Sequence, residues 1–180
     1  MESELRGCVS VTMHDRVQLP RLYLVWPTGP IFDSEQASIS LLSALLGDGK
    51  SSRLYKSLVY EKQIARDIGA MHYAQEIAGE FYLQVTLNQG HTLEEAESVV
   101  RNEIENIVRN PPLERELVRA KNRIEGSHIR QLERVGGFGG RADQLNYYNT
   151  LFGSPEAINT DLDRYNAVTV EDVQRAAASA

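Results

Sequence analysis

The sequence has few of the groups that most often carry chemistry or anchor a chain. It contains one cysteine, Cys8, so neither an intrachain disulfide nor a thiolate zinc cluster can form. Cys8 lies in a strand-like pattern, which predicts a small buried side chain. No apolar run approaches the roughly 20 residues that span a bilayer, and no signal-peptide pattern precedes the first expected strand. With 25 acidic and 19 basic residues, the net charge of -6 argues against a nucleic-acid-binding surface.

Catalytic motifs are missing as well. The four histidines, at positions 14, 72, 91 and 128, include no pair at the i, i+4 spacing that places two imidazoles on one zinc ion. The nearest approach, residues 91–95 (His-Thr-Leu-Glu-Glu), ends in a glutamate instead of a second histidine and better indicates a helix start. We expect His14 and His72 to face solvent and His128 to be a hydrogen-bonded core residue. No G-x-S-x-G motif surrounds a serine, so the residues alone predict no catalytic group and no metal ligand.

One short stretch resembles part of a nucleotide-binding motif. Gly49-Lys50-Ser51 matches the end of the phosphate-binding pattern G-x-x-x-x-G-K-[ST], but Ala44 stands where the first glycine is required. A phosphate loop also follows a buried strand, whereas the residues before Gly47 have helical spacing. The sequence therefore predicts a turn between two helices with a solvated lysine, and no nucleotide-binding residues.

At 180 residues the chain is most simply one domain, and strand patterns are confined to its first half. Residues 9–13 alternate between apolar and polar, which predicts a half-buried strand. The unbroken apolar run 22–26 predicts a central strand covered on both faces. Residues 64–76 and 81–88 have period-two spacing around an Ala-Gly turn, which predicts an antiparallel hairpin.

Helical spacing covers the remaining segments. A capping box is expected at Thr92–Glu95, a second cap at Thr169, and a break at the glycine-rich run 136–140. The expected helices occupy residues 34–47, 52–62, 92–110, 114–134, 141–150, 154–165 and 169–180. Strands joined by tight turns are antiparallel, and helices grouped in sequence tend to cover one face. The order predicts an α+β fold: an antiparallel-rich sheet with helices packed on one face.

Residues 45–55 (Leu-Leu-Gly-Asp-Gly-Lys-Ser-Ser-Arg-Leu-Tyr) and 58–65 resemble the second, non-catalytic domain of pitrilysin/insulinase-type zinc peptidases. Three further stretches, 112–121, 138–143 and 164–173, resemble the same domain in the same order. The matches extend over nearly the whole chain and agree with the expected order of elements. The resemblance implies a fold like that of the mitochondrial processing peptidase.

In that family, homologous α+β domains pair to form half of a hollow clamshell, and a zinc domain carries His-x-x-Glu-His and a further glutamate. The resemblance implies that residues 1–180 are a single chamber-forming domain, a fragment of a longer peptidase that lacks its zinc domain. Zinc, the peptide substrate and peptide hydrolysis would belong to the parent, with the chain inactive alone. The alternative is a structural or assembly subunit of the same fold in a catalytically silent parent. For a bacterial parent, the periplasm or cell envelope is one expected location.

Family members also hold substrate through an arginine and a tyrosine in the stretch equivalent to residues 58–66. Aligned without gaps, those positions are Val59 and Arg66, and neither matches. Tyr60 and Arg66 therefore remain as candidates for substrate contact, with an exposed helix-end tyrosine and an exposed strand arginine as the alternative. The family domain also ends with a strand after its last helix, whereas this chain stops at Ala180. The resemblance thus implies an unpaired sheet edge through which the chain forms a homo-oligomer.

Overall fold

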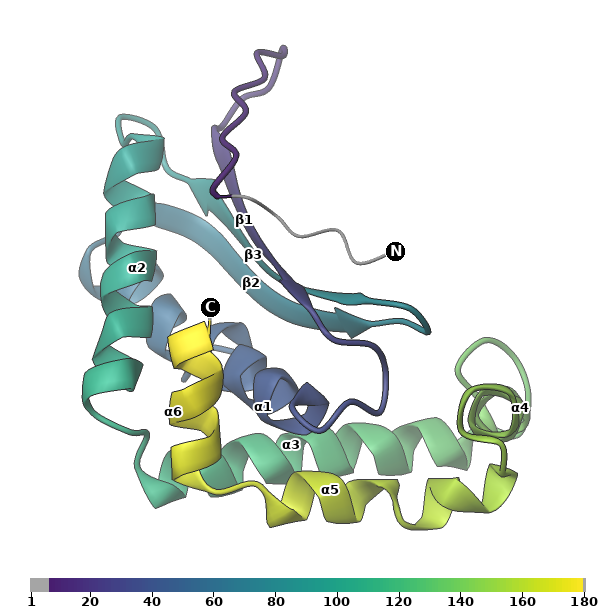
Figure 1. The fold of residues 1–180 in the computed structure, drawn as a ribbon. Coiled ribbons are helices and arrows are strands. Elements are labelled where there is room, and N and C mark those ends of the chain that lie inside the picture. The colour runs from purple at the N-terminus through teal and green to yellow at the C-terminus, as the bar shows by residue number, and fades with distance from the viewer. Residues whose placement is uncertain (1–6, 180) are drawn as a thin grey trace.

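The computed structural model describes residues 7–179 of the chain. Within this range the sheet has three antiparallel strands in the order β1-β3-β2 (Figure 1), namely β1 (Arg21–Thr28), β2 (Ala65–Ala74) and β3 (Gly79–Leu87). The predicted hairpin is confirmed, because β2 and β3 pair in register from Ile68 opposite Val85 to Ala74 opposite Gly79. The predicted α+β fold class is confirmed with it.

Strand β1 lies at an edge of this sheet and pairs with β3 alone among the described residues. Leu22, Leu24 and Trp26 pack against the core, whereas Tyr23 and Val25 on the opposite face are exposed. The prediction of a central strand covered on both faces is therefore wrong. An unbroken apolar run supplies side chains to both faces of a strand, but the helices of this domain cover only one of them.

The segment before β1 is not a strand. Residues 8–15 form no ladder, and Val9, Val11 and Met13 are 74%, 77% and 88% exposed. The predicted half-buried strand is wrong because, within residues 7–179, no strand lies beside it to supply backbone hydrogen bonds. Cys8 belongs to the same segment and is exposed, so its predicted burial is also wrong.

The helices gather on one face of the sheet, as Figure 1 shows. They are α1 (Gln36–Gly47), the π-helix η1 (Tyr55–Glu61), α2 (Leu93–Arg109), α3 (Glu114–Glu133), α4 (Arg141–Phe152), the 3-10 helix η2 (Pro155–Asn159), α5 (Asp161–Ala167) and α6 (Val170–Ser179). The capping box at the start of α2 is confirmed, since the Glu95 amide donates to Thr92 Oγ1 at 3.2 Å. The one helix predicted over residues 154–165 is two, η2 and α5, which meet at Thr160.

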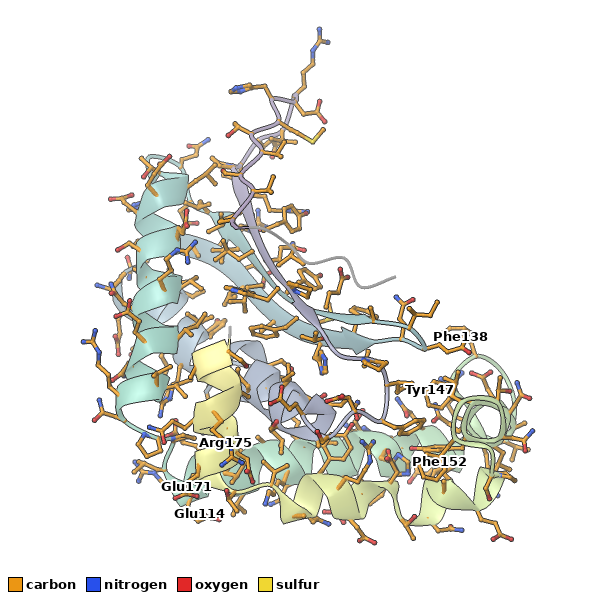
Figure 2. The ribbon with its side chains drawn as sticks, in the orientation of Figure 1. Glu114, Phe138, Tyr147, Phe152, Glu171 and Arg175 are labelled. Atoms are coloured by element: carbon orange, nitrogen blue, oxygen red, sulfur yellow. The ribbon has the colours of Figure 1, made fainter. Side chains whose placement is uncertain are left out.

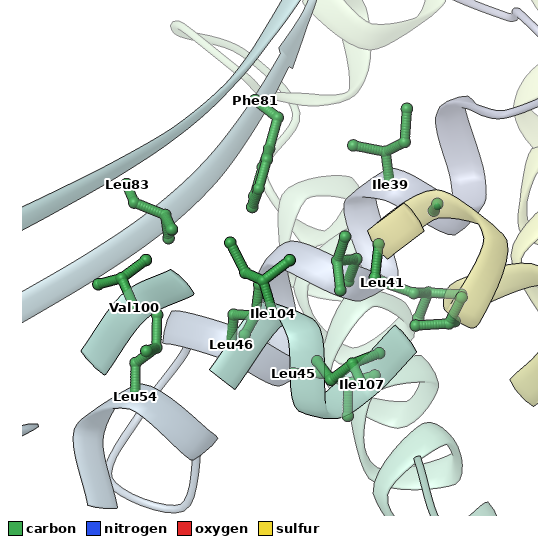
Figure 3. Close-up of a cluster of buried hydrophobic side chains, with 14 of the residues drawn as sticks. Ile39, Leu41, Leu45, Leu46, Leu54, Phe81, Leu83, Val100, Ile104 and Ile107 are labelled. Atoms are coloured by element: carbon green, nitrogen blue, oxygen red, sulfur yellow. The ribbon is translucent and has the colours of Figure 1, made fainter. Parts of the chain in front are cut away.

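The main core lies between the sheet and helices α1, α2 and α6 (Figure 3). Its fully buried side chains come from α1, β3 and α2, and include Leu41, Leu42, Leu45, Leu46, Phe81, Leu83, Val85, Val100 and Ile107. A smaller cluster of Tyr148, Ala157 and Ile158 attaches α4 to η2, with Phe32 and Leu132 packed against it. Among the described residues, no helix combines the length and apolar character needed to cross a membrane.

Candidate functional site

The stretch 45–65 joins α1, η1 and β2, and arginines fasten it to α3. The guanidinium of Arg53 donates two hydrogen bonds to the Glu116 carboxylate, at 2.9 and 3.2 Å. Arg119 donates to the Ser51 carbonyl at 3.3 Å, and Arg123 pairs with Asp48. Burial opposes ionisation of Glu116, but hydrogen bonds from Arg53 and a backbone amide outweigh it and lower the carboxyl pKa. These contacts hold the stretch 45–65 against α3.

In the turn within this stretch, Gly49 has a positive φ of 80°, whereas Gly47 does not. Gly47 is required for another reason, because a Cβ there would lie 2.4 Å from Ala70 Cβ. Ser52 is buried and its hydroxyl donates to the Gly49 carbonyl at 2.7 Å, so its side chain does not cap the following helix. Lys50 is exposed in this turn between two helices, as the sequence predicted.

The second helix of the stretch is a π-helix instead of the expected α-helix. The Lys62 amide donates to the carbonyl of Ser57, five residues earlier, at 3.0 Å. Leu54, just before η1, and Leu58 within it are fully buried and face the core. Gln63 then adopts a left-handed conformation with φ 55° before β2 begins. Single π-turns and left-handed non-glycine residues are both costly and are enriched at functional sites.

Tyr60 and Arg66 lie on either side of this irregular segment. Tyr60, on η1, is 77% exposed. Arg66 is exposed on β2, where the pairing with β3 shifts register between Ala65 and Asp67. Among residues 7–179, no hydrogen bond or ion pair involves either side chain. Their role in substrate contact therefore stays a prediction.

The histidines are dispersed, and no group of three or more metal-ligating side chains comes together within residues 7–179. His14 is exposed, as predicted. His91 lies beside Glu95 at the start of α2, 3.3 Å from its carboxylate. His128 lines a cavity and makes no hydrogen bond among the described residues, so the predicted hydrogen-bonded core histidine is wrong. The metal-ligating side chains of residues 7–179 therefore do not form a zinc site.

His72 faces the helices, so the prediction that it faces solvent is wrong. Its two ring nitrogens lie 2.9 Å from Ser40 Oγ and 3.1 Å from Thr28 Oγ1, so it joins α1, β2 and β1. Burial lowers the pKa of His72, because a low-dielectric surrounding disfavours the imidazolium. His72 is thus a neutral structural link.

This link makes stability depend on pH. The unfolded chain takes up a proton on His72 near pH 6.5, whereas the folded chain resists it to lower pH. The stability associated with the neutral ring is complete above about pH 6.5 and is lost as pH falls through the lowered folded-state pKa, with a slope of at most about 1.4 kcal/mol per pH unit. Urea unfolding between pH 7.5 and 5.0 measures this slope. In His72→Gln the decline should be shallower; an identical decline would contradict the assignment.

The face of the sheet opposite the helices carries exposed apolar and aromatic side chains. Val25, Tyr82 and Met71 are cross-strand neighbours on β1, β3 and β2. Tyr23 and Tyr73 extend this row and are about half exposed, at 53% and 51%. We call these five residues the open sheet face. Sequence reasoning missed it, although the apolar run 22–26 and the outward tyrosines were a signal.

A comparison with protein-family models matches residues 2–124 to the peptidase M16 inactive domain. The chain belongs to this family. The resemblance to the non-catalytic domain of pitrilysin/insulinase-type zinc peptidases is thereby confirmed. The comparison with curated proteins finds no match.

Solved structures agree with the M16 inactive-domain fold. A protease from Helicobacter pylori superposes with a TM-score of 0.80 at 20% identity, over 94% of this chain and 40% of that one. The inactive peptidase domain of a protein from Bordetella parapertussis superposes with a TM-score of 0.76 at 19% identity, over 94% of this chain and 90% of that one. A chain of Complex III2 from Candida albicans, with Inz-5 bound, superposes with a TM-score of 0.71 at 16% identity, over 90% of this chain and 40% of that one. The M16 domain described here thus spans less than half of the Helicobacter protease.

Proposed function

We propose that this chain is a single chamber-forming domain of a longer zinc-dependent endopeptidase, and that the zinc and catalytic groups lie in a companion domain. The observation that carries the proposal is the open sheet face. Side chains on the other side of the sheet pack against the helical core, while Tyr23, Val25, Met71 and Tyr73 remain exposed on this side. A contiguous exposed apolar patch marks a surface that contacts another molecule. In a peptidase, that surface can face extended peptides.

The zinc belongs to the companion domain because the donor set here does not fit it. The nearest histidine–carboxylate pair, His91 and Glu95, belongs to a helix cap whose oxygens already accept backbone amides. A catalytic zinc needs three protein ligands around one open position. The residues of this chain would therefore contribute surface and support, and no step of peptide hydrolysis is assigned to them.

Substitutions on the open sheet face test the proposal in the full parent peptidase. Val25→Ser combined with Tyr73→Ser should lower kcat/KM for a peptide substrate about tenfold, because the surface that contacts the peptide loses apolar area. Zinc content should not change. The matched control is Ile129→Ser, which removes an exposed apolar side chain of α3. Equal activity in the double variant and the control would overturn the proposal.

Tyr60 and Arg66 are proposed as secondary contacts to the peptide. Tyr60 on the π-helix and Arg66 on β2 are both exposed, and neither side chain makes a hydrogen bond or ion pair in the part of the chain that the structure describes. Loss of one exposed polar contact costs about 1 kcal/mol, so Tyr60→Phe and Arg66→Gln should each raise KM about fivefold with kcat unchanged. Steady-state kinetics of the parent measures this. An unchanged KM in both variants would leave them as ordinary surface residues.

A structural or assembly role in a silent parent is the second candidate, and the match to Complex III2 from Candida albicans favours it. The two candidates differ outside this chain, in whether the companion domain carries His-x-x-Glu-His. Zinc analysis and peptide cleavage by the parent distinguish them directly. One zinc per parent chain with cleavage supports the peptidase, and absence of both supports the assembly role.

A further inference from the structure

A cavity of about 330 Å³ lies between the β1–α1 loop, α3, α4 and α5. No residue of the stretch 45–65 and none of the open sheet face lines it. Tyr147, one of its lining residues, is labelled in Figure 2 at the α4 end of the helical layer. Its volume is at the lower end of the roughly 300–1,000 Å³ of small-molecule sites. The cavity is therefore large enough for one ring with a substituent.

Aromatic rings build one wall, and a costly backbone conformation holds the first of them. Phe32 has φ 63°, a left-handed value that a bulky residue rarely adopts. Its ring lies 4.9 Å from that of Phe152, 6.0 Å from Tyr148 and 6.4 Å from Tyr147. The guanidinium carbon of Arg164 lies 5.0 Å from the Phe32 ring centre. A further ring that packs against this cluster would adopt the same tilted or edge-to-face geometry.

The charged groups of the cavity neutralise one another. Arg164 Nε donates to Asp161 Oδ1 at 2.8 Å, and Arg164 Nη1 donates to Gln36 Oε1 at 2.8 Å. Tyr148 donates to the other carboxylate oxygen of Asp161 at 2.7 Å, and burial together with this bond raises the pKa of Tyr148, so the phenol stays protonated. Asp161 and Arg164 are paired with each other, so neither offers an unpaired charge to a ligand. The cavity therefore favours an uncharged ligand.

Further hydrogen-bonding groups line the same cavity. Ser127, His128 and Gln131 of α3 and Gln144 of α4 supply a hydroxyl, an imidazole and two amides. Within residues 7–179, none of these four side chains makes a hydrogen bond. They can donate to and accept from a ligand without breaking an existing contact. The cavity thus offers both aromatic surface and hydrogen-bonding groups.

We propose that this cavity binds an uncharged aromatic ring carrying a hydrogen-bonding substituent, of the phenol or aryl-amide class. The ring packs among Phe32, Tyr147 and Tyr148, and the substituent bonds to Gln131 or Gln144. Such a group can come from a free small molecule or from a tyrosine side chain of a peptide. The site does not depend on the peptidase role proposed above, because binding is measured with this chain alone.

Amide chemical shifts of the isotope-labelled 180-residue chain, titrated with N-acetyl-tyrosinamide, test the proposal. Saturable shifts should map to α3, α4 and α5, with a Kd of about 1 mM for a ligand of this size. A blocked peptide, acetyl-Gly-Gly-Tyr-Gly-Gly-amide, identifies the source: tighter binding than the amide points to a peptide, and equal or weaker binding points to a free molecule. No saturation by either probe, or shifts confined to other elements, would overturn the site.

Two comparisons test the chemistry of recognition. Gln131→Ala should weaken binding about fivefold, which is the worth of one hydrogen bond, whereas Asn122→Ala, a matched amide of α3 outside the cavity, should not. The anion 4-hydroxyphenylacetate should bind at least tenfold more weakly than N-acetyl-tyrosinamide, since the cavity charges are already paired. The proposal would be contradicted if Gln131→Ala and Asn122→Ala weakened binding equally, or if the anion bound as tightly as N-acetyl-tyrosinamide. Saturable binding of glucose, which has no aromatic ring, would also contradict it.

Discussion

Replacing Phe81 with alanine should lower the free energy of unfolding by about 4 kcal/mol. Phe81 is the third residue of β3 and has 1% of its surface exposed. Its ring stacks on Trp26 of β1, with 5.3 Å between ring centres and 26° between planes. The substitution removes a large apolar side chain and one half of an aromatic pair, and neither neighbouring strand can move in to fill the space.

Trp26 is the only tryptophan of the chain, so its fluorescence reports this change directly. Urea unfolding followed by tryptophan emission gives the free energy, and the folded-state spectrum of Phe81→Ala should shift because the ring against Trp26 is gone. The matched control is Phe138→Ala, whose ring is 95% exposed on the loop between α3 and α4. That variant should change stability by less than about 0.5 kcal/mol. Equal losses in the two variants would contradict this account of the core.

Elements specified by nearby residues could be predicted from the sequence. The hairpin of β2 and β3 follows from period-two spacing around one turn, and the cap of α2 follows from Thr92 and Glu95 alone. The inward position of His72 also had a local signal. Ile68 is buried, and residues two and four positions later share its face of the strand, so His72 belongs with the core side.

Features that depend on distant partners could not be predicted. An apolar run such as 22–26 fits a central strand or an edge strand equally, and only the neighbouring strands decide which. The alternating residues 9–13 have a strand pattern but no partner strand among the described residues. The cavity is the extreme case, because Phe32, Tyr147 and Arg164 meet there from three distant segments. No spacing in the sequence relates them.

Gly47 shows how a distant contact can reverse a local expectation. It is the last residue of α1, and alanine in a helix is favoured over glycine by about 1 kcal/mol. Helix propensity therefore predicts that Gly47→Ala stabilises the protein. However, the added Cβ would lie 2.4 Å from Ala70 Cβ and 2.5 Å from the Ala70 backbone nitrogen. These distances are far inside van der Waals contact, so α1 and β2 would have to separate.

We expect Gly47→Ala to destabilise the protein by about 3 kcal/mol, as overpacking of a close helix–strand contact does. Adding Ala70→Gly should recover only part of the loss, because the backbone nitrogen of residue 70 remains in place. The matched control is Gly126→Ala within α3, where the nearest obstacle is the mobile end of Arg130 at 3.3 Å. In that variant the free energy of unfolding should rise by up to about 1 kcal/mol. Urea unfolding of the three variants measures these changes in the free energy of unfolding. If Gly47→Ala and Gly126→Ala both stabilised the protein, α1 would not lie this close to β2.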